Sequence, residues 1–239
     1  MEKDFSPFEK SIGVQFKKKD HLRQAFVHRS YLNENPSFPL GHNERLEFLG
    51  DAVLELVVTE YLYAQYPEAP EGDMTNWRAS LVNAKMLSRI ASEIDMDRFL
   101  YLSKGESKDG ESRARQYILA NAIEALIGAI YLDRGYGISR DFIARYVFPE
   151  LPNILEKRLD VDPKSKLQEY AQEKVRVTPN YQVLAETGPD HAKWFKVGVF
   201  FAKDMVATGE GDSKQEAQVN AATNALKARG WEDEEMPAS

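Results

Sequence analysis

The sequence predicts a multidomain protein, in which an all-helical α domain is followed by a smaller α+β domain of order α-β-β-β-α. As far as Phe148, apolar residues recur with the helical period of about 3.6 residues. Further along, three short segments alternate apolar and polar residues and are rich in β-branched and aromatic types. We therefore expect domains at 5–158 and 164–231, with a linker at 159–163 and an acidic tail at 232–239.

The helices of the first domain are predicted in order from apolar periodicity and from the residues that stop helices. The long third helix should end where Tyr66 precedes Pro67, because the residue before a proline disfavours helical conformation. We expect a turn at EAPEGDMT and a polar loop over residues 105–115. The predicted helical segments are 8–12, 19–26, 43–65, 74–91, 116–133 and 138–158.

The second domain is predicted to begin with a helix at 164–175 and to end with a helix at 213–229. Between them, alternation predicts strands at 181–186, 194–202 and 205–211. This order suits a three-stranded antiparallel sheet with both helices on one face.

Composition excludes several classes of protein. The chain has no cysteine, which rules out disulfides and thiolate metal ligands. It has no apolar run of membrane-spanning length, and MEKDFSPFEKSIG lacks the apolar core of a secretory signal, so we expect a cytoplasmic protein without a membrane partner. The net charge of −7 argues only weakly against nucleic-acid binding, because the distribution of charge matters more than its sum.

The most informative segment is HNERLEFLGDAVLEL at 42–56, which places carboxylates inside an apolar run. Glu47 and Asp51 are four residues apart and share a helix face, where like charges cost about 0.2–0.5 kcal/mol. A second apolar helix carries Asn121 and Glu124, which are three residues apart. Because burying an unpaired charge is expensive, we expect the two pairs to face each other across a cation. All-oxygen ligands favour a hard cation, and Mg²⁺ is the first choice.

A solvated helix face is the ordinary explanation for acidic residues at helical spacing, because carboxylates are seldom buried. The spacing alone leaves this explanation and metal binding open. We interpret His28 and His42 as structural groups, since the oxygen cluster needs no nitrogen ligand.

Several segments resemble the signatures of the ribonuclease III family: NERLEFLGDA at 43–52, HRSY at 28–31 and ILANAIEALIGAIYLD at 118–133. Residues 160–230 resemble a double-stranded RNA-binding domain through KSKLQEYAQ, GPDHAKWF and GEGDSKQEAQVNAA. The resemblance covers nearly the whole chain in the order typical of bacterial ribonuclease III. It implies a ribonuclease III catalytic domain, a double-stranded RNA-binding domain and a homodimer that forms through the catalytic domain.

The resemblance implies an endoribonuclease that uses Mg²⁺, with Mn²⁺ as the substitute, to cut double-stranded RNA into products with 5′-phosphate and 3′-hydroxyl ends. Ribosomal RNA precursors, transfer RNA and structured messenger RNA are the implied substrates. A bound metal ion lowers the pKa of its water and clamps phosphate oxygens, so no nucleophilic side chain is needed.

Carried over by position, Asp51 and Glu124 match the catalytic residues of the family, and Glu44 and Glu71 match accessory acidic positions. Phe48 matches an aromatic residue of the dimer interface, although core packing is the other interpretation. The implied metal ligands are Glu47, Asp51, Asn121 and Glu124.

The chain departs from the family at Asn121, where aspartate is usual. Asparagine keeps one ligand oxygen and loses the negative charge. Either the enzyme works and needs more Mg²⁺, or the chain is a weakened or inactive protein that only binds double-stranded RNA. We favour a working enzyme, because three carboxylates remain and amide oxygens are ordinary ligands of hard cations.

The second domain departs from its family at Gln215 and Gln218, where basic residues are typical. Phosphate contacts supply most of the affinity and its salt dependence, so we expect weaker and less salt-sensitive RNA binding than in a lysine-rich relative. The implied RNA contacts are Gln168, Glu169, His191, Lys193 and Lys214.

Overall fold

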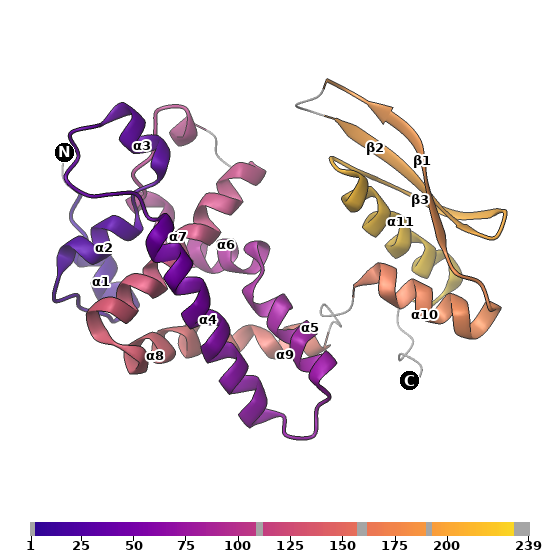
Figure 1. Ribbon diagram of the computed structural model, residues 1–239, viewed down its shortest axis with the longest axis horizontal. Coiled ribbons are helices and arrows are strands. Elements are labelled where there is room, and N and C mark those ends of the chain that lie inside the picture. The colour runs from indigo at the N-terminus through magenta and orange to yellow at the C-terminus, as the bar shows by residue number, and fades with distance from the viewer. Residues whose placement is uncertain (1–2, 109–111, 157–161, 190–192, 232–239) are drawn as a thin grey trace. The chain divides into compact units, whose positions relative to one another are not determined.

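The computed structural model describes residues 3–108, 112–156, 162–189 and 193–231 (Figure 1). The chain divides into two compact units, Met1–Asp160 and Val161–Ser239. The predicted acidic tail, residues 159–161 of the predicted linker and His191 lie outside the described residues. None of the described helices has the length and apolar character needed to cross a membrane.

The first unit is helical, which confirms the predicted fold class. Its short 3-10 helices are Met96–Phe99, Glu106–Lys108 and Phe148–Glu150. Its α-helices are α1 Ser6–Ile12, α2 Lys19–Ala25, α3 Arg29–Glu34, α4 Glu44–Gln65, α5 Glu71–Val82, α6 Ala84–Glu93, α7 Arg113–Arg134, α8 Tyr136–Tyr146 and α9 Leu151–Glu156.

The predicted helix at 74–91 is wrong in extent, because the structure contains two helices, α5 and α6. The residue between them, Asn83, is extended, and its side chain caps α6 by accepting a 2.9 Å hydrogen bond from the backbone N–H of Met86. The turn expected at EAPEGDMT ends earlier than predicted, since α5 already begins at Glu71. A capping asparagine satisfies the free N–H groups of a new helix, and here this local bond ends one helix and starts another.

The predicted helix at 138–158 is also divided, into α8, a 3-10 turn and α9. Pro149 lies in the 3-10 turn and Pro152 in the first turn of α9. Proline has no backbone N–H and cannot continue a preceding helix, which explains the break. The short helix α3 was not predicted, and it is capped by His28, whose Nδ1 accepts from the N–H of Ser30 at 3.3 Å.

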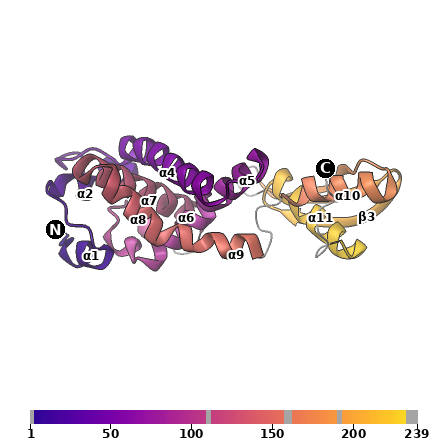
Figure 2. The same ribbon diagram turned by 90° about the horizontal axis from the view of Figure 1, so that it is seen from below.

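At the centre of the first unit, α4 packs along α7, and this is the most extensive contact between described helices (Figures 1 and 2). The middle of α7 is enclosed, with Ile123, Ile127 and Ile130 fully buried. Helix α4 is buried on one face only, because Phe48 and Tyr63 on the other face are 82% and 75% exposed. The apolar run at 42–56 therefore does not form a wholly buried helix.

The second unit has the predicted order and confirms the α-β-β-β-α class. Its strands pair antiparallel in the order β1-β2-β3. Leu167 and Tyr170 from the first helix pack with Val197 of β2 and Ala221 of the last helix, so both helices cover one face of the sheet. Its elements are α10 Pro163–Val175, β1 Asn180–Thr187, β2 Trp194–Phe201, β3 Asp204–Gly211 and α11 Lys214–Arg229.

Candidate active site

The start of α4 is anchored by Asn43, the buried first residue of the NERLEFLGDA segment. Its backbone N–H donates to the carbonyl of Val27 at 2.9 Å, and its side-chain amide donates to the carbonyl of Ala25 at 3.2 Å. Its own carbonyl accepts from the N–H of Leu46 at 2.8 Å. These bonds fix the first turn of α4, which carries Glu47.

The charges of α4 and α7 act on one another across the helix contact. Burial raises the pKa of Glu124 to about 8, with further contributions from the negative charges of Asp51, Glu47 and Glu55. Burial also raises the pKa of Glu47, helped by the charges of Glu44 and Asp51. Such shifts require that the carboxylates of the two helices lie near one another.

Within the described part of the chain, the central carboxylates have no basic partner, whereas the flanking ones do. Among the described residues, no hydrogen bond or ion pair joins a cation to Glu47, Asp51 or Glu124. Glu44 lies 3.6 Å from Arg29, and Glu55 lies 2.9 Å from Arg78 of α5. The unneutralised charge is therefore concentrated where α4 faces α7.

The donor set fits a hydrated divalent cation by its chemistry. Asn121 and Glu124 are half-buried on α7, and Glu47 is half-buried on α4. The side chains of all three offer oxygen atoms as metal ligands. In the described part of the chain, no three His, Cys, Asp or Glu side chains already converge closely enough to hold an ion together. Mg²⁺ tolerates this arrangement, because it usually keeps several waters and binds through only one or two carboxylates.

Two residues at this site were missed by the sequence analysis as functional candidates. Glu55 lies one helical turn beyond Asp51 and acts electrostatically on Glu124, and its spacing is a signal that could have identified it. Arg78 binds Glu55 and also donates to the hydroxyl of Thr59 at 3.0 Å. No sequence signal identifies Arg78, because its partners lie on another helix.

The structure does not bring Glu71 into this cluster. Glu71 is exposed in the first turn of α5, and its charge is not among those that shift the pKa of Glu47 or Glu124. Its accessory role stays a prediction.

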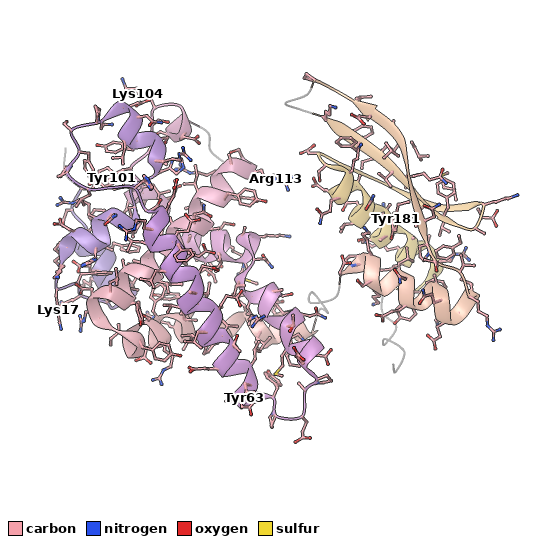
Figure 3. The ribbon with its side chains drawn as sticks, viewed as in Figure 1. Lys17, Tyr63, Tyr101, Lys104, Arg113 and Tyr181 are labelled. Atoms are coloured by element: carbon pink, nitrogen blue, oxygen red, sulfur yellow. The ribbon has the colours of Figure 1, made fainter. Side chains whose placement is uncertain are left out.

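Phe48 is not a core residue of this chain, because its side chain points away from the buried face of α4. Leu56 and Tyr63 are also exposed on this helix, and Tyr63 is labelled near the end of α4 (Figure 3). These three exposed apolar residues form a stripe along α4, the helix that also carries Glu47 and Asp51.

In the second unit, four of the predicted RNA contacts are exposed or lie in an ion pair. Gln168 and Glu169 are exposed on α10. Lys193 donates to a carboxylate oxygen of Glu186 at 2.8 Å, and Lys214 lies 3.8 Å from the other oxygen of the same residue. Glu186 was missed by the sequence analysis, and it brings together the start of β2 and the start of α11.

The two glutamines that replace basic residues differ in their surroundings. Gln215 is exposed at the start of α11. Gln218 accepts a 2.8 Å hydrogen bond from Lys164 of α10. The second substitution therefore links the two helices of this unit.

Comparison with known proteins agrees with both units. Residues 18–151 match a family described as Ribonuclease-III-like, and residues 163–228 match the double-stranded RNA binding motif. A protein named Ribonuclease 3 from Oceanobacillus iheyensis is 43% identical over 223 residues, which is 93% of this chain and 97% of that protein. Ribonuclease 3 from Pelotomaculum thermopropionicum is 44% identical over 90% of this chain and 89% of its own length.

A solved structure is also similar to the first unit. The nuclease domain of ribonuclease III from Campylobacter jejuni is 36% identical, with a TM-score of 0.56 over 62% of this chain and 99% of that one. That structure is described as flexible in a region involved in dimer formation. Since the nuclease family matches more than half of the chain and relatives match nearly all of it, this chain belongs to the ribonuclease III family.

Proposed function

We propose that this chain is an endoribonuclease that hydrolyses the phosphodiester bonds of double-stranded RNA with Mg²⁺, for which Mn²⁺ can substitute. One observation carries the proposal: Glu47, Asp51 and Glu124 act on one another without a described basic partner, in a chain that also has a double-stranded RNA binding motif. The products carry 5′-phosphate and 3′-hydroxyl ends. Ribosomal RNA precursors, transfer RNA and structured messenger RNA in the cytoplasm are the proposed substrates.

The side chains divide the work by position. Glu47, Asp51, Asn121 and Glu124 would hold the ion through oxygen atoms. When bound, the ion activates a water molecule and stabilises the charge that develops on the phosphate. Asp51 and Glu124 are the proposed catalytic carboxylates: exposed Asp51 is open to RNA and water, while half-buried Glu124 lies in a medium that strengthens its interaction with a cation.

The second unit would hold the duplex by its shape. Gln168 and Glu169 on α10 suit contacts to the minor groove, and Lys193 and Lys214 suit phosphate contacts. His191, which lies outside the described residues, is proposed as a further RNA contact. Such contacts read A-form geometry rather than base sequence.

A protein that only binds double-stranded RNA is the alternative raised by Asn121. It is not favoured, because the relatives that match nearly the whole chain are named as ribonucleases. Glu47, Asp51 and Glu124 also keep three carboxyl groups at the site.

The test is cleavage of a long RNA duplex in Mg²⁺, with Ca²⁺ supporting binding without cleavage. We expect Glu124→Gln to slow cleavage by about 10³-fold or more and to leave RNA binding unchanged. Glu68→Gln, which removes the same charge from an exposed loop, is the control and should cleave normally. Intact RNA binding without Mg²⁺-dependent cleavage by the unmodified chain would support the binding-only alternative.

We further propose that two chains associate through the stripe of Phe48, Leu56 and Tyr63. An exposed aromatic side chain at the centre of an interface is often worth about 2 kcal/mol or more, so Phe48→Ala should weaken self-association by about 30-fold. Sedimentation equilibrium measures this change. Val53→Ala, at a buried position on the same helix, should lower the melting temperature of the chain and leave self-association unchanged. An unchanged dimer constant in Phe48→Ala would exclude this interface.

A further inference from the structure

Helices α4 and α7 touch backbone to backbone at two glycines. A Cβ atom on Gly50 would lie 1.7 Å from the carbonyl oxygen of Glu124, and one on Gly128 would lie 2.2 Å from the carbonyl oxygen of Leu46. Real Cβ atoms essentially never come closer than 3.0 Å to such an atom. Any side chain at either position would therefore push the two helices apart.

Neither glycine is needed for the conformation of its own helix. Both lie inside long helices, and neither has a positive φ. Glycine inside a helix costs about 1 kcal/mol relative to alanine. A Cβ atom on Gly137, which is also helical, would meet no described neighbour within 4 Å, so a glycine inside a helix of this chain does not by itself imply a close backbone contact.

The backbone contact lies at the residues that carry the carboxylates. Gly50 lies against the backbone of Glu124 itself, and Glu47 and Asp51 stand three residues before and one residue after Gly50. Helix axes ordinarily pack about 8–10 Å apart, whereas this contact admits no side chain between the backbones. Mg²⁺ holds its direct oxygen ligands at about 2.0–2.1 Å, so moving the helices roughly 1 Å further apart would weaken the binding of one ion by ligands on both.

We propose that Gly50 and Gly128 are positioning residues of the metal site, because their lack of side chains sets the distance between the helices that carry Glu47, Asp51 and Glu124. The inference rests on the proposed metal-dependent function. The backbone contact between α4 and α7 would then fix the spacing of the ligands before any ion binds.

The experiment compares Gly128→Ala and Gly50→Ala with the control Gly137→Ala in the full-length chain. Circular dichroism reports helix content, and the rise in melting temperature on adding Mg²⁺ reports ion binding independently of catalysis. Gly137→Ala should keep the full metal-induced rise. Gly128→Ala should keep its helix content, lose most of that rise and need at least about tenfold more Mg²⁺ for half-maximal cleavage. Gly50→Ala should be affected more, since its clash is closer.

An equal metal-induced rise in Gly128→Ala and in the unmodified chain would overturn the inference and leave the proposed function intact. No rise in the unmodified chain would overturn both. If Gly128→Ala fails to fold, Mn²⁺ binding by Glu124→Asp tests whether ion binding depends on the spacing of the ligands. That change shortens the side chain by one methylene and leaves the helix contact in place. A tenfold or larger loss of Mn²⁺ affinity supports dependence on ligand spacing. Unchanged affinity overturns it.

Discussion

The two units of this chain arrange their charges differently. In the helical unit, the negative charges of Asp51 and Glu47 add to burial in raising the pKa of Glu124 to about 8. In the second unit, the hydrogen bond from Lys193 lowers the pKa of Glu186, and the charge of Lys214 adds to this effect. The carboxyl groups of the helical unit can be neutralised by a bound cation. In the second unit, Glu186 partly neutralises the lysines that would bind phosphate.

The largest expected effect comes from adding a negative charge to the acidic cluster, which increases the difference in charge between the two units. Asn121→Asp supplies a further anionic oxygen, so the Mg²⁺ concentration for half-maximal cleavage should fall by about tenfold. Asn76→Asp, on an exposed part of α5, is the control of equal charge. Superimposable Mg²⁺ curves for the unmodified chain and Asn121→Asp would show that the amide oxygen already serves as well as a carboxylate.

In metal-free protein, pH should affect the stability of the two units in opposite directions. The pKa of Glu124 is about 8 in the folded chain against an ordinary value of 4.5, so the folded state holds this proton more tightly than the unfolded state. The free energy of unfolding contributed by Glu124 must therefore fall as pH rises between these two values. For Glu186 the pKa is lowered, so its contribution is present above its ordinary pKa and is lost as pH falls.

Melting of the chain in a chelator tests this contrast. Glu124→Gln should melt a few degrees higher than the unmodified chain at about pH 8.5 and nearly equally at about pH 4. Glu68→Gln should show no such difference. A gap that is the same at both pH values would contradict the raised pKa.

A lysine at the exposed start of α11 should make RNA binding by the second unit tighter and more salt-sensitive, as expected for a lysine-rich relative. Gln215→Lys adds one phosphate contact, so the affinity for duplex RNA should rise several-fold and the salt slope should steepen by about 1. Gln218→Lys should gain less, because it removes the acceptor of Lys164. Binding measured across KCl concentrations distinguishes the variants, and an unchanged slope in Gln215→Lys would count against the predicted phosphate contact.

The smallest expected effect concerns Glu186. Glu186→Gln frees Lys193 and Lys214 from a shared carboxylate, and we expect RNA to bind about twofold more tightly at low salt, because exposed ion pairs are weak. Glu210→Gln breaks the comparable 3.1 Å pair with Lys196 and should leave RNA binding unchanged. Weaker binding in Glu186→Gln would instead mean that Glu186 holds the lysines in productive positions.

Much of the fold could be predicted because its signals are local. The period of apolar residues separates the helical unit from the sheet unit, and the two polar pairs are visible because helical spacing places the two members of each pair on one face of their helix. The same spacing predicted Glu47 with Asp51 and Asn121 with Glu124, and the cost of burying charge suggested that the two pairs face each other. Local signals were misread where a single residue changed the course of the chain, as at Asn83 between α5 and α6.

The sequence by itself determined the two domain classes, the main helices and strands, and the faces on which the acidic side chains lie. Only the tertiary structure decided that Phe48 is exposed, that Arg78 neutralises Glu55, and that α4 and α7 meet through Gly50 and Gly128. The physical reason is the distance along the chain between the residues that interact. Helical and strand periodicity depend on neighbours a few residues away, whereas these contacts join segments far apart in the chain and depend on how closely two backbones can pack.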